Sequence, residues 1–571
     1  MASSTEMHTK SKSKLPVIAA IDIGTANSGY AFGMRAELQN SPLSIHCNQT
    51  WNSGNYLSLK TPTCLLLNEH GQFQAFGYEA QEQYAVLLQA KKHQQYFYFK
   101  NFKMRLGGYS EFRKDMLMDD ENGRAFLAIS VFALSIQYFK EHFLYALRSH
   151  NTGMTANDVQ WVLTVPAIWS HHAKQFMREA AIQAGIEGKR LRLALEPEAA
   201  SVYCVTSGVL VRDVGTIYMV VDIGGGTADI TVHRIENGGR LAEVYRASGG
   251  AWGGMAVDFE FEKQMRKIIG TDVLRDFSDE HKLDYIHMMR SFELAKRSVD
   301  ASKQKDVQVL VPTSLVEFCK SRGKTLEKAI SDIGNTGIRL SRDRIAFGFS
   351  VMNKMMQPAI KPILGRIREI LQSIPNVTDI LLVGGFSESS LVSKAVREEF
   401  GQVDVRVAID PGISVLKGAV LFGFAPSTII SRVTRFTYGM HRSEPFQEGK
   451  HNPEFKVEMD GTQRCQNIFQ ILVTKDMSIP VDHVIKRRSK TLYEGQKSIP
   501  YKMYVSKSKT PTYVKDDGCS LIGSEIVEID QPGKATRWFH DSYMFGDTEI
   551  RLQVECEKTG KKWNFTFQLP Q

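Results

Sequence analysis

Apolar and polar positions follow two different patterns along the 571 residues of this chain. From residue 15 to residue 425, short apolar runs that suit buried strands alternate with segments in which apolar residues recur at helical spacing. After the Ala-Pro-Ser sequence at 425–427 the spacing changes to period two, as in 550–556 and 563–569. The first pattern predicts an α/β region with covered sheets, and the second predicts a separate all-β region.

These runs also place the individual elements. We expect strands at residues 15–23, 159–166, 191–195, 217–223, 377–383 and 405–409. We expect helices at residues 123–149, 170–184, 196–205, 256–300, 342–374 and 414–422. Near the end of the chain, the Lys-Thr-Gly-Lys turn at 558–561 is expected to join the two period-two runs as a hairpin.

The segment at 217–232 combines apolar strand formers with three glycines at 224–226. It predicts a strand, a tight turn and a second strand, with the Asp222 carboxylate at the mouth of the turn. Glycines leave the backbone N–H groups open to a ligand, and phosphate is the usual occupant of such a turn. Asp222 and Asp229 repel phosphate, so a divalent cation, held through water, would have to lie between them. A turn whose glycines serve only the chain reversal is the alternative.

A weaker copy of this pattern occurs near the N-terminus, where an apolar run ends in Asp-Ile-Gly-Thr-Ala at 22–26. Asp22 and Asp222 are 200 positions apart, a separation that indicates two duplicated lobes rather than a short repeat. Two such hairpins that face each other would enclose one polyphosphate, and their aspartates would share one metal ion.

Two further segments carry candidate chemistry. Glu196 precedes Pro-Glu-Ala-Ala at 197–200, which places it in the first turn of a helix and at the carboxyl end of a strand. Functional groups often occupy that position in α/β proteins, although a solvated capping glutamate is the alternative. Farther along, Glu293 and Arg297 are one helical turn apart, and a surface ion pair explains them without a ligand.

Composition and charge exclude several classes of protein to which the chain could belong. The net charge of +9 is small for this length and the basic residues are dispersed, so we expect no nucleic-acid partner. Seven widely spaced cysteines without a Cys-x-x-Cys pair indicate reduced thiols in the cytoplasm or the nucleus. Residues 1–14 are polar and lack the apolar core of a signal peptide, so we expect a disordered tail. The apolar run at 126–139 is too short to cross a membrane and predicts a buried helix.

Taken in order, the motifs resemble the actin-like ATPase superfamily and, within it, the 70-kDa heat-shock chaperones. They are Asp-Ile-Gly-Thr at 22–25, Glu-Pro-x-Ala-Ala at 196–200, Asp-Ile-Gly-Gly-Gly-Thr-x-Asp at 222–229, Glu-x-Ala-Lys-Arg at 293–297, Gly-Gly at 384–385 and Asp-Pro-Gly at 410–412. The resemblance covers about residues 15–425. It implies an α/β fold of two ribonuclease-H-like lobes around one site for Mg²⁺ and ATP or ADP.

The resemblance implies a role for each matching residue. Asp22 and Asp222 would hold Mg²⁺ through water, and with Glu196 and Asp229 they would form the catalytic carboxylates. The phosphates and the nucleoside would be held by Gly24, Thr25, Ala26, Gly224, Gly225, Gly226, Thr227, Gly253, Gly254, Glu293, Lys296, Arg297, Gly384, Gly385 and Asp410. The chemistry would consist of positioning and charge neutralisation.

Four departures from the family pattern resemble the divergent branch called heat shock 70 kDa protein 12. Gln81 stands where the family carries a lysine that reaches the γ-phosphate, and Lys91 or Lys92 could compensate. Loss of one such donor lowers a rate by about 10²–10³. Glu388 stands where an arginine usually stacks on adenine. Residues 429–435 replace the acidic, leucine-rich linker of the family, and no helical lid follows the β region.

The β region resembles a shortened form of the family's peptide-binding sandwich, through its sequences at 472–480 and 493–495. Its basic run at 486–490 is interpreted as a solvated β-loop, with a localisation signal or an acidic-lipid patch as alternatives.

The expected organisation has four parts. A disordered tail at 1–14 precedes a first nucleotide-binding lobe at 15–215. The second lobe spans 216–425, and its helix at 410–424 packs back towards the first lobe. A truncated, β-sandwich-like domain without a lid occupies 426–571.

The function implied by the resemblance is that of an ATP-binding, chaperone-like protein of the stress response, with weak or conditional hydrolysis of ATP to ADP and phosphate. Protein clients or signalling partners would bind its β domain, and the protein would be a monomer in the cytoplasm or nucleus. A nucleotide-gated scaffold that does not hydrolyse ATP is the main alternative, and a small-molecule kinase is another.

Overall fold

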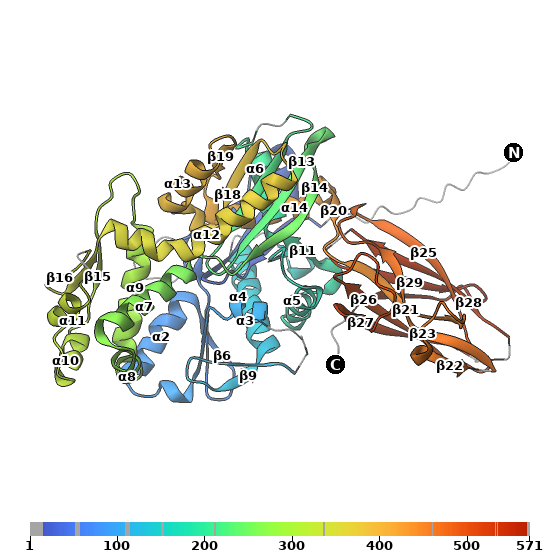
Figure 1. Cartoon of the computed structure of the whole chain (residues 1–571), viewed down its shortest axis with the longest axis horizontal. Coiled ribbons are helices and arrows are strands. Elements are labelled where there is room, and N and C mark those ends of the chain that lie inside the picture. The colour runs from blue at the N-terminus through green and yellow to red at the C-terminus, as the bar shows by residue number, and fades with distance from the viewer. Residues whose placement is uncertain are drawn as a thin grey trace.

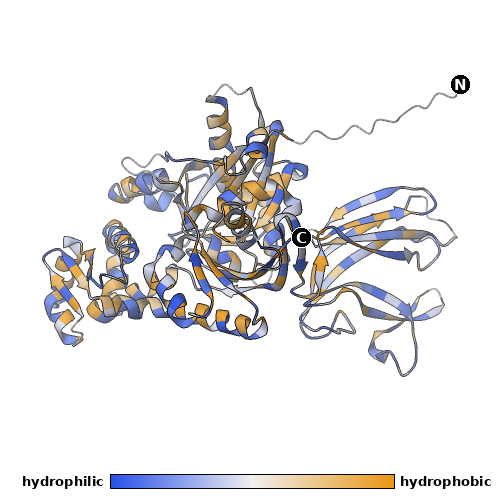
Figure 2. Ribbon diagram, turned by 90° about the horizontal axis from the view of Figure 1, so that it is seen from above, coloured by the Kyte–Doolittle hydropathy of each residue, from blue (hydrophilic) through white to orange (hydrophobic). Residues whose placement is uncertain are grey.

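The computed structural model describes residues 15–51, 58–108, 113, 115–149, 153–210, 213–334, 337–459, 461–530, 533, 535–546 and 548–567. The expected tail at 1–14 lies outside the described residues. Figure 1 shows a mixed body of helices and sheets, with the strands of the C-terminal region gathered at one end of the molecule. The hydropathy colouring of Figure 2 shows apolar residues concentrated on the central strands and on one side of many helices of that body.

The first apolar run forms β1 (Val17–Asp22), a central strand of a six-stranded sheet in the order β11-β10-β1-β2-β3, with β4 paired to β2. The other strands are β2 (Asn27–Met34), β3 (His46–Cys47), β4 (Thr61–Pro62), β10 (Val159–Val165) and β11 (Leu191–Leu195). β1 is antiparallel to β2 and parallel to β10. Alternate residues of β1 belong to two different apolar clusters, so helices cover both faces, and this explains why the run is continuously apolar.

The second sheet has seven strands in the order β19-β18-β12-β13-β14-β20-β24. They are β12 (Ile217–Ile223), β13 (Ala228–Glu236), β14 (Arg240–Gly250), β18 (Asp379–Val383), β19 (Asp404–Val407), β20 (Ile429–Val433) and β24 (Ser478–Pro480). β12 is antiparallel to β13 and parallel to β18, as β1 is to β2 and β10. In both sheets, the first strand of the antiparallel hairpin has two parallel strands on its other side: β10 and β11 beside β1, and β18 and β19 beside β12.

Helices and small sheets surround these two sheets. The helices are α1 (Arg35–Asn40), α2 (Gly77–Gln89), α3 (Lys103–Gly108), α4 (Ala128–Ser149), α5 (His171–Gln183), α6 (Glu196–Thr206), α7 (Met255–Ile269), α8 (Thr271–Glu280), α9 (Lys282–Arg297), α10 (Thr313–Ser321), α11 (Leu326–Asp332), α12 (Phe349–Ser373), α13 (Ser390–Glu399) and α14 (Pro411–Phe424). The small strands are β5 (Cys64–Leu67), β6 (Phe73–Phe76), β7 (Phe97–Lys100), β8 (Leu117–Asp119), β9 (Ala125–Leu127), β15 (Val307–Leu310), β16 (Ile338–Ser341) and β17 (Arg344–Phe347).

Three helices differ from their predicted bounds by more than a single turn or are divided. The helix predicted at 256–300 is divided into α7, α8 and α9, because Gly270 adopts a φ of 100° that ends α7. The helix predicted at 342–374 begins only at Phe349, because the preceding residues form β17 and pair with β15 and β16. The helix predicted at 123–149 begins at Ala128, because β9 precedes it and pairs with β8.

α14 follows the second sheet in sequence but packs on α6 and on the first sheet. A Cβ built on Gly418 would lie 1.7 Å from the carbonyl oxygen of Ala199 in α6. One built on Gly423 would lie 2.6 Å from side-chain atoms of both Ile18 and Val162. Because any larger residue would push the elements apart, Gly418 brings α14 directly against α6, and Gly423 brings it against strands β1 and β10.

Strands dominate the C-terminal region. A five-stranded sheet contains β22 (Lys456–Met459), β23 (Thr462–Val473), β21 (Thr437–Pro445), β26 (Ser498–Ser506) and β27 (Cys519–Glu528) in that order. A four-stranded sheet contains β25 (His483–Lys490), β28 (Trp538–Phe545), β29 (Arg551–Cys556) and β30 (Lys562–Thr566). The predicted C-terminal hairpin is confirmed as the β29–β30 pair. The interpretation of the basic run as a loop is wrong, because it lies in β25, which pairs with β28 along its full length.

No helix within the described residues is both long and apolar enough to span a bilayer. All seven cysteines lie within the described residues, and each is a free thiol rather than part of a disulfide. The apolar run at 126–139 enters the buried helix α4, as predicted.

The C-terminal core encloses Asp541, which is 3% exposed and accepts hydrogen bonds from Tyr501 at 2.8 Å and Ser489 at 3.1 Å. Burial raises the pKa of this carboxyl from 3.8 to about 6, against the lowering effect of the two hydroxyls. The folded state therefore binds more protons than the unfolded state between pH 4 and pH 6, and its stability falls as the pH rises through that window.

Asp541→Asn is expected to remove about 1–3 kcal/mol of this pH dependence, because asparagine keeps the acceptor oxygen without the charge. Urea denaturation of both proteins at pH 4, 5, 6 and 7 would measure it. Parallel pH profiles for the two proteins would contradict the assignment.

Candidate functional site

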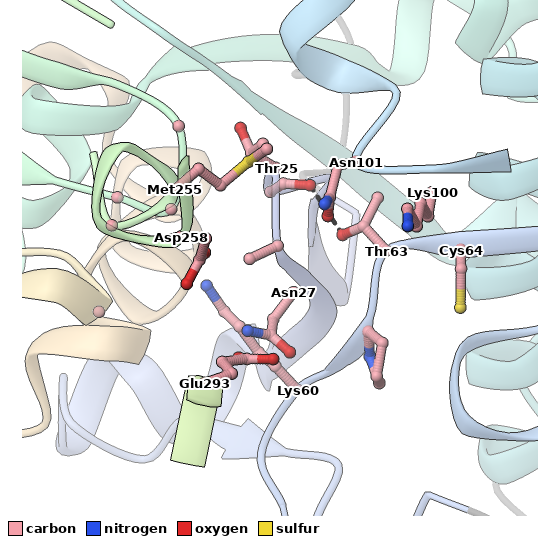
Figure 3. Close-up of a pocket in the computed structure, with 18 of the residues that line it drawn as sticks. Thr25, Asn27, Lys60, Thr63, Cys64, Lys100, Asn101, Met255, Asp258 and Glu293 are labelled. Atoms are coloured by element: carbon pink, nitrogen blue, oxygen red, sulfur yellow. Dashed lines mark hydrogen bonds between the residues drawn. The ribbon is translucent and has the colours of Figure 1, made fainter. Parts of the chain in front are cut away.

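A cleft of about 1020 Å³ lies between the turns of the β1–β2 and β12–β13 hairpins. Its walls also include residues of α2, α7 and α9, the segment before β4 and the turn after β18. Figure 3 shows side chains from separate parts of the chain, Thr25, Lys60, Asp258 and Glu293, projecting into this space. Segments far apart in sequence therefore form one site.

The two glycine-containing turns contact each other directly. A Cβ built on Gly225 would lie 2.8 Å from the Cβ of Ala26, and one built on Gly226 would lie 2.7 Å from Oγ1 of Thr25. The backbone N–H groups of residues 253–255 donate to the carbonyls of the second turn at 2.8–3.1 Å. Among the described residues, the N–H groups of Gly225 and Gly226 have no backbone acceptor, so they can serve as donors to an anion.

Asp22, at the end of β1, is 5% exposed and has a lysine partner. Its Oδ2 lies 2.7 Å from Nζ of Lys60, and its Oδ1 accepts a hydrogen bond of 2.6 Å from Thr164. Burial opposes ionisation of Asp22, but Lys60 and Lys103 together with these hydrogen bonds hold its pKa below the ordinary value. Asp22 is therefore a carboxylate whose charge is compensated inside the protein.

Glu196, at the start of α6, faces a second lysine. Nζ of Lys103 lies 2.6 Å from Oε1 of Glu196, and the two side chains are 5% and 11% exposed. Burial favours the neutral amine, but Glu196 and Asp22 outweigh it and raise the pKa of Lys103. Burial also raises the pKa of Glu196, and the ammonium only partly reverses that effect. The ammonium of Lys103 thus lies among the carboxylates of the cleft.

Asp222 and Asp229 carry the remaining negative charge. Asp222 is 6% exposed, and burial together with the neighbouring Glu196, Asp229 and Asp22 holds its pKa well above the ordinary value. Asp229 is 1% exposed, accepts a hydrogen bond of 2.9 Å from the backbone N–H of Ile168, and has a pKa raised mainly by burial. Lys60 lowers the pKa of Asp222 only in part, and no ion pair to Asp222 occurs among the described residues, so its ionised form is poorly compensated.

The donor set fits a hydrated divalent cation. Four buried carboxylates, those of Asp22, Glu196, Asp222 and Asp229, face two lysines, so two negative charges remain when all are ionised. Within the described residues, no three carboxylate, histidine or cysteine side chains converge closely enough to bind a metal directly. Mg²⁺ retains several of its waters in proteins and suits such an arrangement.

The cleft contains a lysine beside Glu196, although neither Lys91 nor Lys92 supplies it. Gln81 lines the cleft from α2, but Lys103 at the start of α3 supplies the ammonium beside Glu196. Lys91 and Lys92 are exposed and do not line the cleft. Lys103 belongs to none of the sequence motifs, and its partner Glu196 is 93 positions away, so local sequence did not point to it.

Cations and carboxylates of α7, α9 and the segment after β18 also line the cleft. Glu293 and Arg297 form the expected ion pair on α9, at 2.5 Å, while both line the cleft. Lys296 is buried and pairs with Asp258 of α7 at 2.6 Å. Glu388 is exposed on the cleft wall after β18.

The structure brings nearly all predicted site residues into this one cleft. Asp229 and Gly253 do not line it. Asp229 lies behind it, bonded to Ile168, and Gly253 lies against the backbone of the second turn, where an added Cβ would be 2.6 Å from Gly225. The predicted residues that do line the cleft are Asp22, Gly24, Thr25, Ala26, Glu196, Asp222, Gly224, Gly225, Gly226, Thr227, Gly254, Glu293, Lys296, Arg297, Gly384, Gly385 and Asp410.

Comparison with known proteins identifies the class. The family model described as Hsp70 protein matches residues 115–428, and the chain belongs to that family. It is thus a chaperone-like, nucleotide-binding protein, and the family generally binds ATP or ADP with Mg²⁺.

The relatives also identify the branch. The chain is 32% identical over 613 residues to heat shock 70 kDa protein 12A of Mus musculus, covering 95% of this chain and 90% of the relative. It is 31% identical over 633 residues to heat shock 70 kDa protein 12B of Homo sapiens, covering 97% and 91%. Chaperone protein DnaK of Mycoplasmopsis synoviae is 28% identical over 284 residues, covering 49% and 43%. The predicted heat shock 70 kDa protein 12 branch is confirmed.

Proposed function

We propose that the protein binds ATP and ADP with Mg²⁺ in the cleft between two lobes, residues 15–215 and 216–425, and hydrolyses ATP slowly or conditionally. The observation that carries this proposal is the contact between two glycine-containing turns. One turn follows β1, which ends at the buried Asp22, and the other follows β12, which ends one residue after the buried Asp222. Backbone N–H groups that can bind phosphate and carboxylates that can bind Mg²⁺ through water therefore line the same cleft.

Each group has a role in this proposal. The N–H groups of Gly225 and Gly226 would donate hydrogen bonds to phosphate oxygens. Asp22 and Asp222 would hold Mg²⁺ through its bound waters, and the ion would neutralise phosphate charge. Lys103 would donate to the transferred phosphoryl group, and Glu196 would orient the attacking water. Because Glu196 is paired to Lys103, the two act as one unit.

The non-hydrolysing scaffold remains the second candidate. It is favoured by Glu388, which presents an exposed carboxylate on the cleft wall after β18, and by the departure of residues 429–435 from the family linker. Lys103 favours hydrolysis, because it provides the positive charge that Gln81 lacks. A small-molecule kinase is disfavoured, because the relatives match the chain along nearly its full length, including the β region.

Isothermal titration calorimetry with Mg²⁺-ATP and Mg²⁺-ADP tests the binding proposal. Asp222→Ala is expected to lose the Mg²⁺-dependent part of the affinity, about tenfold or more, because the uncompensated carboxylate is removed. Asp404→Ala is the matched control, since Asp404 is exposed, lies outside the cleft and pairs with Arg406. If the folded wild-type protein gives no heat of binding with either nucleotide, the proposal is wrong.

We also propose that protein clients or signalling partners bind residues 426–571, in a monomer of the cytoplasm or nucleus. Large apolar side chains are exposed in this region, at Met477, Val484, Tyr493 and Ile526. Exposed apolar side chains are suited to contact with another protein.

A further inference from the structure

Lys60 is a half-buried cation beside one of the two carboxylates assigned to the metal ion. Its side chain is 18% exposed, and its Nζ lies 2.7 Å from Oδ2 of Asp22, one of the two carboxylates assigned to Mg²⁺. Lys103 already compensates Glu196, so Lys60 is not required for that partner. Figure 3 shows Lys60 extending into the cleft with Asn27 of the first turn and Glu293 of the opposite wall also drawn.

The backbone places Lys60 there. It immediately precedes β4, which pairs with β2 in the register Ser28 to Thr61, so the residue is tied to the strand that leaves the first turn. A Cβ built on Gly29 would lie 3.1 Å from Cγ of Lys60, so the glycine provides the space that the lysine stem occupies. The carbonyl oxygen of Lys60 also accepts a hydrogen bond from Ser58. The ammonium is therefore positioned by strand pairing and packing.

The charges near Asp22 and Asp222 differ in their compensation. Asp22 has the Lys60 ammonium at 2.7 Å, whereas no ion pair to Asp222 occurs among the described residues. An ammonium within a few ångströms of a carboxylate opposes a second cation at the same carboxylate by simple Coulomb repulsion. The same ammonium attracts phosphate oxygens, and lysine is a common phosphate ligand.

We propose that Lys60 is a built-in counter-ion at the metal position, which competes with Mg²⁺ for Asp22 and reduces the dependence of nucleotide binding on divalent metal. The statement about nucleotide binding rests on the proposed function. The competition between Lys60 and a metal ion for Asp22 does not, because it also applies to the nucleotide-free cleft. Phosphate binding and metal binding are thereby partly uncoupled in this chain.

The first experiment uses Mn²⁺ alone, followed by its electron paramagnetic resonance signal during titration of the nucleotide-free, full-length protein. Lys60→Met is expected to bind Mn²⁺ about tenfold more tightly than wild type, because one unit charge near the site is removed. Lys60→Arg keeps the charge and is expected to behave like wild type. Lys100→Met is the control, since Lys100 lines the same cleft but pairs with Glu121 at 3.0 Å.

Equal Mn²⁺ affinities in wild type and Lys60→Met, including equally undetectable binding, would overturn the inference. Should Lys60→Met fail to fold, as judged by circular dichroism and thermal melting, Lys60→Gln serves instead, because its amide can still donate to Asp22.

The second experiment separates the inference from the proposed function. ADP affinity is measured by calorimetry with Mg²⁺ and with EDTA. The ratio of the two affinities is expected to be about tenfold larger in Lys60→Met than in wild type. A wild type that binds no nucleotide contradicts the proposed function, while the Mn²⁺ result still decides the competition at Asp22. A wild type that binds nucleotide with the same ratio as Lys60→Met contradicts only the role of Lys60.

Discussion

Lys103→Met is expected to lower the single-turnover rate of ATP hydrolysis by about 10²–10³-fold, the usual effect of removing one preorganised electrostatic donor. Lys103 is 5% exposed, lies 2.6 Å from Glu196 and also faces Asp22 and Asp229. Its raised pKa keeps it charged at neutral pH, so it can neutralise charge that develops on the transferred phosphoryl group. Rapid mixing of Mg²⁺-ATP with excess protein, followed by quantification of ADP, measures the rate.

Two comparisons make this result specific. Lys100→Met removes an ammonium from the same cleft that is paired with Glu121, and its rate is expected to stay near that of wild type. Nucleotide affinity of Lys103→Met is expected to change much less than its rate. If wild type forms no ADP in a single turnover while it binds ATP, the non-hydrolysing scaffold is the correct function. Unchanged hydrolysis in Lys103→Met would remove Lys103 from the mechanism.

Arg432→Met is expected to lower the free energy of unfolding by about 3–5 kcal/mol, because it leaves a buried carboxylate without its partner. Nε and Nη2 of Arg432 each lie 2.7 Å from an oxygen of Glu198, and the two side chains are 9% and 2% exposed. Arg432 lies in β20, which extends the second sheet beside β14, and Glu198 lies in α6 two residues after Glu196. The ion pair therefore connects the segment before the C-terminal sheets to the helix that carries a candidate catalytic group.

Urea denaturation of Arg432→Met, Glu198→Met and the double variant provides a thermodynamic cycle. The double variant is expected to be more stable than either single variant, because neither member of the pair is left as a buried charge without the other. Additive losses in the double variant would show that the two side chains do not depend on each other. Arg406→Met is a control, since Arg406 pairs with Asp379 and Asp404 away from α6.

The elements that build the phosphate turns could be predicted from short stretches of sequence. Apolar strand formers, a carboxylate and glycines are neighbours in the chain at 217–232, and the conformations they favour are local. The bounds of β11 were predicted to the residue for the same reason. The helix predicted at 342–374 was too long at its start, because pairing of β17 with β15 and β16 is a long-range interaction that outweighs helical periodicity.

Lys60 and Lys103 could not be assigned in the same way. Lys60 pairs with an aspartate 38 positions earlier, and Lys103 pairs with a glutamate 93 positions later. Neither lysine belongs to a motif, and the interpretation of Gln81 as the missing lysine position followed from a local match in α2. Similarly, the change at residues 429–435 was visible in sequence, but the pairing of β20 with β14 and the contact of Arg432 with Glu198 were not.

Local sequence was thus sufficient to establish two strand–turn–strand units with an aspartate, a helix that begins at Glu196, and membership of the 70-kDa heat-shock family, because these depend on neighbouring residues and their order. The folded arrangement was needed to show which charges face one another: two lysines against four buried carboxylates, with Asp22 compensated and Asp222 not. Burial and distance set the strength of a charge interaction, and both arise from contacts between residues far apart in the chain.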